Sequence, residues 1–193
     1  RYTGSLNNFL VNNFSVEFSG HIREKQGKWM PFTSTQYNFV NASTCLFFMK
    51  AVMKHLPVKG FHCFKNDKAD MDIRILSLFK VQYKSGKEMD IAETVTFFND
   101  MCCMAPATLI DKRITWMEIK DDSVEASFAN NGITISAWLY FNDKGELINF
   151  VSEDRYALMK DGTMQKLTWS TPLKDYKIIS DRMLATSAEA IYT

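Results

Sequence analysis

The feature that most constrains this chain is a two-residue alternation of apolar and polar side chains. It runs through Phe14–Ile22 near the start and returns in Ile133–Phe141, where most alternate residues are apolar. Successive side chains of a β-strand point to opposite faces, so the pattern predicts strands with one buried and one solvated face. The chain is therefore predicted to be mainly β.

Alternation and turn residues together predict an antiparallel meander. Residues 24–28 are typical of a hairpin loop, and Asn131-Gly132 between two alternating runs is a strong hairpin pattern. The strand 71–84 is expected to be covered on both sides in its middle, around Leu76 and Leu78. The predicted strands cover residues 14–22, 32–39, 45–53, 61–65, 71–84, 114–120, 124–129, 133–141, 147–154, 165–169, 176–179 and 185–192.

One segment changes to the period of a helix. Asp90 and Glu93 have the spacing of a capping box, and Pro106 is expected to end the helix and to open a further turn, 107–110. Two apolar stripes lie side by side, and the remaining wedge of the helix, with Glu93, Asn99 and Asp100, is expected to face solvent. The stripes are Ile91, Val95, Phe98, Cys102 and Ala105, and Phe97, Met101 and Met104.

These elements limit the possible architectures. About ten antiparallel strands cannot form one flat open sheet, which has to curl or split at that size. A strongly curved sheet, or half-barrel, that wraps the helix would cover both the apolar face of the helix and that of the sheet. A closed barrel and a β-sandwich are the alternatives. We expect one domain over residues 1–193, as a fragment of a longer chain.

Charge and composition exclude several classes of protein. Lys and Arg number 23 against 22 Asp and Glu, a net charge of +1, which gives no electrostatic case for nucleic acid or for an anionic membrane. No run of about 18 apolar residues is present, so no transmembrane segment is expected. The 15 Phe and 11 Met residues are the one compositional indication of an apolar ligand.

The sequence gives little support for a metal site, a bound cofactor or a reactive thiol. The histidines are His21, His55 and His62, and none has the spacing of a metal site. A glycine-rich phosphate loop is also missing, so no cofactor is expected. Free, buried thiols are expected rather than disulfides, although a nucleophilic pairing of Cys102 or Cys103 with a histidine stays open. The four cysteines are Cys45, Cys63, Cys102 and Cys103.

The predicted helix carries a recognisable motif. It is Ala92–Cys102, AETVTFFNDMC, followed by APATLID at Ala105–Asp111 and by Trp116. Further stretches that belong with it are Gly27–Phe32, Leu56–His62, Asp154–Tyr156, Trp169–Pro172 and Asp175-Tyr176. Together they resemble an uncharacterised bacterial family of domains of unknown function, over most of the chain after Phe14. That resemblance implies a family and no particular activity.

The expected architecture also resembles the periplasmic lipoprotein-carrier (LolA-like) half-barrel. This likeness concerns the arrangement of a curved sheet and a helix. It implies a lipid-like ligand and a location in the cell envelope or periplasm, by analogy of fold alone.

Four ionisable residues are candidates for catalysis. Glu93 and Asp100 could form a carboxylate pair at a cavity, with Asp154 and Arg155 at the end of a predicted strand. The structural alternative is that Glu93 caps the helix, Asp100 lies in solvent or pairs with a base, and Arg155 pairs with an acidic neighbour. An acid–base mechanism requires these groups to converge on one pocket.

The leading functional hypothesis is a non-catalytic module that holds an apolar or lipid-like ligand in a half-barrel cavity. The alternatives are a hydrolase that uses the four ionisable residues and a structural or interaction domain of a larger envelope protein, which a long exposed edge strand or an apolar patch would favour. The oligomeric state is not predicted. The candidate ligand-binding residues are Trp29, Phe32, Tyr37, Phe97, Met101, Met104, Arg155 and Trp169.

Overall fold

The computed structural model describes residues 11–23, 27–159 and 161–193. The expected hairpin loop at 24–28 lies partly outside these residues. The chain divides into an N-terminal unit, Asn12–Asp90, and a C-terminal unit that includes Ile91–Thr193. The prediction of a single domain over residues 1–193 stays a prediction. Both units consist of antiparallel strands, and the prediction of a mainly β fold with one principal helix is confirmed.

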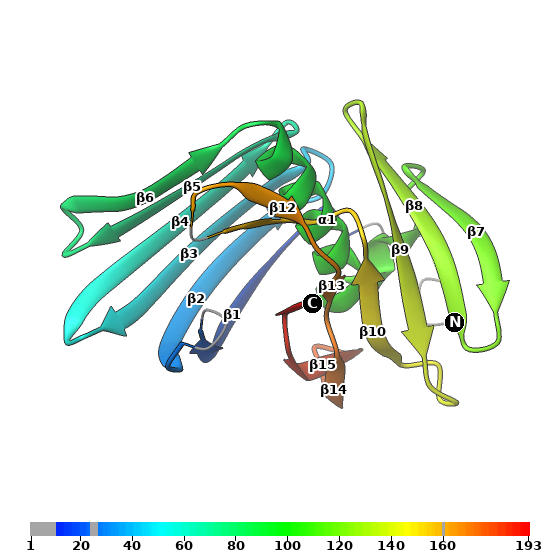
Figure 1. Cartoon of the computed structure of the whole chain (residues 1–193). Coiled ribbons are helices and arrows are strands. Elements are labelled where there is room, and N and C mark those ends of the chain that lie inside the picture. The colour runs from blue at the N-terminus through cyan, green and yellow to red at the C-terminus, as the bar shows by residue number, and fades with distance from the viewer. Residues whose placement is uncertain (1–10, 24–26, 160) are drawn as a thin grey trace. The chain divides into compact units, whose positions relative to one another are not determined.

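The N-terminal unit is a six-stranded meander, β1-β2-β3-β4-β5-β6, in which each strand pairs with the next (Figure 1). Two-residue turns, which suit the twist of antiparallel strands, join β3 to β4 and β4 to β5. The strands are β1 (Asn13–Ile22), β2 (Met30–Phe39), β3 (Thr44–Met53), β4 (Leu56–Lys65), β5 (Lys68–Ile75) and β6 (Phe79–Ser85).

The C-terminal unit contains most of helix α1 (Lys87–Met104) and a second six-stranded sheet with the order β16-β13-β10-β9-β8-β7. A 3-10 helix, η1 (Pro106–Ile110), follows α1, as the position of Pro106 predicts. Two small hairpins, β11–β12 and β14–β15, complete the unit. The strands are β7 (Ile114–Lys120), β8 (Ser123–Asn130), β9 (Ile133–Phe141), β10 (Leu147–Ser152), β11 (Tyr156–Leu158), β12 (Met164–Lys166), β13 (Trp169–Ser170), β14 (Leu173–Ile179), β15 (Arg182–Ala188) and β16 (Ile191–Tyr192).

The core of the C-terminal unit forms where α1 packs on the sheet. Phe98 is fully buried, and its ring stacks on Phe128 of β8 with centroids 5.1 Å apart. It also meets Phe150 of β10 edge to face at 5.7 Å. Phe97 reaches the same Phe128 ring at 6.3 Å. The apolar stripes of the helix are thus confirmed as core.

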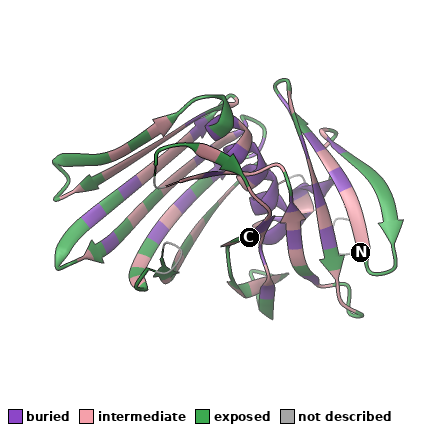
Figure 2. Cartoon of the chain, viewed as in Figure 1, coloured by how far each residue is buried: buried purple, intermediate pink, exposed green. Residues whose placement is uncertain are grey.

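The solvated wedge expected on the helix is wrong. Glu93, Asn99 and Asp100 are all buried, as Figure 2 shows by the colour of most of α1. A helix buried almost all round has to place its polar residues inside as well, where they need partners.

The capping box at Asp90 is also wrong, because the helix begins at Lys87. The first helical hydrogen bond runs from Asp90 N to Gly86 O, and Gly86 has a φ of 116° that favours glycine. The Asp90 carboxylate instead accepts from Ala69 N at 2.8 Å and from Lys68 Nζ at 3.1 Å, both on β5. A tertiary contact therefore uses the side chain that the spacing assigned to a cap.

The predicted long strand 71–84 is two strands joined by a turn at Leu76 and Ser77, where φ is 54° and 62°. Leu76 and Leu78 are exposed rather than covered on both sides. Leucine rarely occupies such a turn, so residue type gives no warning of it. The predicted strands 165–169 and 185–192 are likewise each divided in two, and 61–65 extends back to Leu56.

Neither six-stranded sheet closes on itself, because β1, β6, β7 and β16 each end a sheet. The closed barrel is therefore wrong for the described residues. Strong curling of a sheet around the helix is not confirmed, and neither is the LolA-like architecture. Each sheet is an open antiparallel surface with two distinct faces.

The core around Phe98 generates a stability prediction. Phe98→Ala should lower the free energy of unfolding by about 3–5 kcal/mol, because it removes a fully buried ring from between Phe128 and Phe150. The matched control is Phe79→Ala, since this ring is 64% exposed and its loss should change stability by about 0.5 kcal/mol or less. Chemical denaturation of both variants measures these changes in the free energy of unfolding. Equal effects would mean that α1 is not packed as described.

Candidate functional site

One face of the N-terminal sheet is lined mainly by apolar side chains that are only partly covered. Strand register places them together, since directly opposed residues share a face. Aromatic rings touch across it: Phe18 meets Phe32 at 6.0 Å and Phe47 at 6.1 Å, and Phe47 meets His62 at 5.7 Å. We call this the apolar face; its half-buried members include Phe14, Val16, Phe18, Phe32, Phe47, Met49, His62, Met71, Ile73 and Ile75.

Strand β2 interrupts the apolar face with polar residues. Ser34, Gln36 and Asn38 point to this face and are buried, whereas Tyr37 and Phe39 of the same strand are exposed on the other one. The pattern of β2 is thus inverted relative to the usual rule that apolar residues point inward. Departures of this kind concentrate at functional sites.

Asn38 is the most unusual member of this polar stripe. It is 1% exposed and lies between Phe14 of β1 and Cys45 of β3 in the strand register. Neither its Nδ2 nor its Oδ1 has a hydrogen-bond partner among the described residues. A buried amide without partners costs free energy, and such groups are rare in folded proteins. Asn38 therefore presents a donor and an acceptor that a polar group on the apolar face could satisfy.

The opposite face of the same sheet is more exposed. Phe48 lies next to Phe47 in sequence but points the other way, where it contacts Phe61 at 4.8 Å and Tyr37 at 6.4 Å. Figure 2 shows buried and exposed bands alternating along these strands. Adjacent residues of β3 therefore provide matched probes of the two faces.

The ionisable candidates of the C-terminal unit form one buried cluster around Arg155. Its Nε and Nη2 donate to Thr96 Oγ1 at 3.1 and 3.0 Å, and Nη2 donates to Glu93 Oε1 at 3.5 Å. The guanidinium carbon lies 4.1 Å from the ring centroid of Trp169 and 5.0 Å from that of Tyr192. Helix α1 supplies Glu93 and Thr96, and the paired strands β13 and β16 supply the two rings.

The partners of Arg155 indicate a structural role. Only 11% of its side chain is exposed. Burial lowers the pKa of Arg155, while the Glu93 and Asp100 carboxylates act in the opposite direction. Guanidinium groups stay charged under such shifts, so the cluster is a buried ion pair whose guanidinium also lies against two aromatic rings. Arg155 does pair with an acid, but the partner is Glu93 of the helix and not the acidic neighbour at the strand end that the sequence analysis expected.

Asp154 takes part in a different set of contacts. Its Oδ2 accepts from Ser136 N at 2.8 Å, and its Oδ1 pairs with Lys166 Nζ at 2.8 Å. These bonds join the loop after β10 to β9 and β12. The contacts of Asp154 are thus separate from those of Glu93, and a shared acid–base mechanism stays a prediction.

The cysteines are all free, as expected. Burial raises the pKa of both the Cys102 and the Cys103 thiol well above the ordinary value. A protonated thiol is a poor nucleophile, so neither residue is activated for covalent catalysis. Cys103 Sγ lies 3.6 Å from Asn99 Oδ1 within the helix.

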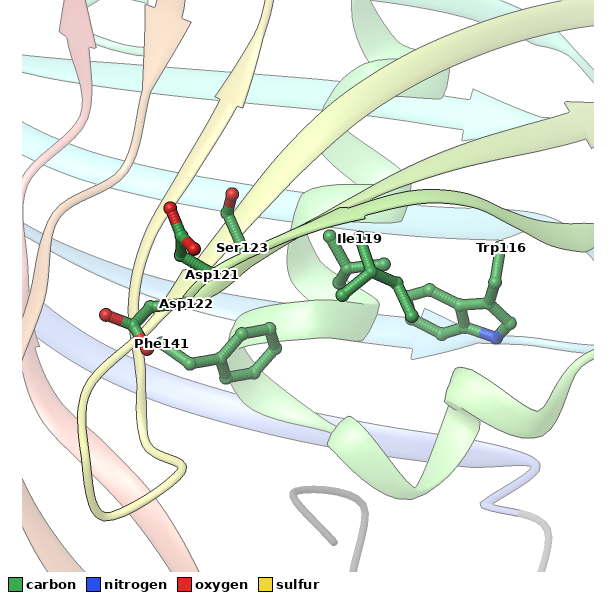
Figure 3. A pocket seen from close by; sticks show the side chains of 7 residues that line it. Trp116, Ile119, Asp121, Asp122, Ser123 and Phe141 are labelled. Atoms are coloured by element: carbon green, nitrogen blue, oxygen red, sulfur yellow. The ribbon is translucent and has the colours of Figure 1, made fainter.

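A shallow apolar pocket of about 400 Å³ lies at the β7–β8 hairpin (Figure 3). Trp116 and Ile119 of β7 line it together with Phe141 at the end of β9, and the carboxylates of Asp121 and Asp122 stand at the turn. Ile119 is 77% exposed, so this depression is open to solvent and is not an enclosed cavity. The sequence analysis did not single it out as a site.

The predicted ligand-binding residues do not share one surface. Phe32 lies on the apolar face, whereas Tyr37 lies on the opposite face of the same sheet. Trp29 is exposed beside β2, with Arg23 over its ring at 4.3 Å. In the C-terminal unit, Phe97 and Met101 are buried, Met104 is half-buried, and Arg155 and Trp169 meet in the ion-pair cluster.

The described residues contain neither a metal-ligand cluster nor a helix suited to cross a membrane. No group of three or more His, Cys, Asp or Glu side chains among them is placed to hold a metal ion. None of the helices in this part of the chain has the length and apolar character that a membrane-crossing helix needs.

Fold and site together define a mainly β protein built of open antiparallel sheets, one of which carries a partly covered apolar face with a buried polar stripe. The chain matches the DUF6544 family, described as a family of unknown function, over residues 1–193, and it belongs to that family. The resemblance to an uncharacterised family is thereby confirmed. No curated protein and no solved structure matches the chain significantly.

The Arg155 cluster generates a second stability prediction. Arg155→Met should lower the free energy of unfolding by about 3–5 kcal/mol, because it removes the buried guanidinium that pairs with the Glu93 carboxylate. The double variant Glu93→Gln/Arg155→Met should recover part of that loss. Lys166→Met, which removes a half-exposed partner of Asp154, is the control and should change stability by about 1 kcal/mol or less. If Arg155→Met is as mild as the control, the cluster does not stabilise the fold as described.

Proposed function

We propose that this protein binds an apolar, lipid-like molecule on the apolar face of its N-terminal sheet. The observation that carries the proposal is the unpartnered, buried amide of Asn38 within a surface of Phe, Met, Val and Ile side chains. Ligand sites are typically apolar surfaces with a few placed polar groups that fix orientation. The arrangement therefore suits an amphiphile whose hydrocarbon part lies on the rings and whose polar group reaches Asn38.

The chemistry of the face supports a flexible hydrocarbon rather than a rigid polar ligand. Met49 and Met71 have adaptable thioether side chains that follow irregular apolar shapes. Across three strands, the Phe18 ring meets Phe32 edge to face and Phe47 at a tilt, which makes a continuous aromatic surface. In the proposal this surface is one wall of a LolA-like half-barrel, and the protein works in the cell envelope without catalysis.

A second candidate function is an interaction domain, and strand β7 favours it. β7 ends its sheet, and Trp116, Met117 and Ile119 on it are exposed beside the shallow pocket. An exposed apolar edge strand is a surface on which another chain could pair. The hydrolase hypothesis has no comparable observation in its favour, because Glu93 and Asp154 have separate partners.

Two neighbouring residues on β3 test the proposal. Phe47→Ala should weaken binding of the fluorescent fatty acid cis-parinaric acid by about tenfold, since Phe47 lies on the apolar face. Phe48→Ala makes the same change on the opposite face and should leave the dissociation constant unchanged. Fluorescence titration of the two variants and the unchanged protein measures this. Equal weakening by both variants, or no binding by the unchanged protein, would contradict the proposal.

Replacing Asn38 is expected to change stability and ligand binding in opposite directions. Asn38→Leu should raise the free energy of unfolding of the ligand-free protein by about 1–3 kcal/mol, because it removes an unsatisfied buried amide. The same change should weaken binding of cis-parinaric acid, whose carboxylate loses its hydrogen-bond donor. The control is Asn13→Leu, which makes the same substitution at an exposed position on β1. A loss of stability without any change in binding would show that Asn38 serves the fold and not a ligand.

A further inference from the structure

One end of the N-terminal sheet exposes large apolar side chains on its turns. The six strands follow one another in an antiparallel meander, so the turns after β1, β3 and β5 lie at the same end. Leu78, in the turn between β5 and β6, is 76% exposed, and Phe79 at the start of β6 is 64% exposed. We call this the apolar end; its exposed residues are Ile22, Trp29, Val52, Leu56, Leu76, Leu78 and Phe79.

The opposite end of the same sheet gives an internal comparison. Its β4–β5 turn is Asn66-Asp67, with φ of 51° and 68°, which are residues that tolerate this conformation. At the apolar end the same kind of turn is made by Leu76-Ser77 and by Lys54-His55, also at positive φ. Leucine at such a position is conformationally unfavourable and is exposed to water. Neither backbone geometry nor core packing therefore accounts for the apolar side chain at this turn.

Basic residues stand directly behind these turns. Lys50 of β3 is opposite Lys59 of β4, Lys59 is opposite Arg74 of β5, and Arg74 is opposite Lys80 of β6. Like charges directly opposed in a sheet are destabilising, and here Asp72 pairs with Arg74 and Lys80 at 2.9 and 3.5 Å. Lys54 lies in the β3–β4 turn itself. A row of cations thus crosses the four strands β3 to β6. It lies about three residues, or ~10 Å, from the turns of the apolar end.

The charge of the chain is divided unevenly between its parts. Residues 12–90 contain 12 Lys and Arg against seven Asp and Glu, a net charge of +5. The remaining residues contain 11 Lys and Arg against 15 Asp and Glu, a net charge of −4. The total of +1 therefore conceals a basic N-terminal unit, and the sequence argument against an anionic membrane does not hold for this unit.

We propose that the apolar end docks onto the surface of an anionic lipid bilayer. Leu76, Leu78 and Phe79 would enter the boundary between head groups and acyl chains, where apolar side chains are buried to a depth of about 5–10 Å. The basic row would then lie at the level of the anionic head groups, which attract Lys and Arg. Trp29, with Arg23 over its ring, has the amphipathic character of residues that anchor at this interface.

The charge complementarity selects the bilayer as the occupant. When the turns of the apolar end insert into the bilayer, each turn buries its own apolar side chains. Each of these turns is also flanked by Lys or Arg residues, which the anionic head groups attract. The inference goes beyond the proposed function and does not depend on it, since it concerns the turns and not the apolar face.

Vesicle flotation tests this inference with the purified protein. It should bind vesicles of phosphatidylcholine that contain about 30% phosphatidylglycerol and should bind pure phosphatidylcholine vesicles at least about tenfold less well, and high salt should release it. Leu78→Ser/Phe79→Ser should lower the partition coefficient about tenfold or more, because two exposed apolar side chains no longer insert. Lys50→Gln/Lys59→Gln should lower it about fivefold for each charge removed.

The matched control is Ile119→Ser, which removes an equally exposed apolar side chain from β7 in the C-terminal unit. Its partition coefficient should not change. The tryptophan emission of the unchanged protein should shift to shorter wavelength with anionic vesicles, and this shift should be absent in Trp29→Phe. Circular dichroism establishes that each variant is folded. Absence of binding to the anionic vesicles, equal binding to neutral vesicles, or an equal loss in Ile119→Ser would overturn the inference.

Discussion

The register of strand β2 between β1 and β3 is the constraint on which the proposed site depends. Val16, Gln36 and Phe47 stand opposite one another, as do Phe18, Ser34 and Met49. A slip of β2 by one residue would turn Tyr37 and Phe39 to the apolar face and move Asn38 to the other side. The observed register instead buries three polar side chains among apolar neighbours. The unpartnered amide of Asn38, and with it the proposal of an amphiphilic ligand, follows from this pairing.

The alternation of side chains predicted most of the strands and their antiparallel pairing, although it merged β5 with β6, β12 with β13 and β15 with β16. It identifies the more buried face of β1 at Phe14, Val16 and Phe18, although Ile22 is exposed, and Asn131-Gly132 forms the expected turn, with φ of 47° and 85°. It could not show which face of β2 is covered, because both faces of that strand mix polar and aromatic residues: Phe32 shares a face with Ser34, Gln36 and Asn38, and Tyr37 and Phe39 share the other with Thr33 and Thr35. Only the neighbouring strands decide that question. Candidate residues such as Tyr37 were therefore grouped with Phe32 although the two lie on opposite faces.

Tertiary contacts account for the other differences from the sequence analysis. Asp90 has the spacing of a helix cap, but Ala69 and Lys68 of β5 use its carboxylate. Asp100 has the position of a solvated residue on an isolated amphipathic helix, but in the C-terminal unit α1 is buried almost all round. Arg155 finds its acidic partner Glu93 at a separation of 62 residues, which no local pattern can indicate. The total charge hides the basic character of the N-terminal unit for a similar reason, since it averages over both parts of the chain.

The most direct test of the central claim is native mass spectrometry of the protein purified under mild conditions, followed by solvent extraction and identification of what is released. Our account predicts an adduct of one lipid-like molecule per chain, which dissociates on activation and is found in the extract. A spectrum of the ligand-free mass alone, with no amphiphile in the extract and none taken up from added fatty acid, would contradict the claim that the apolar face is a binding site.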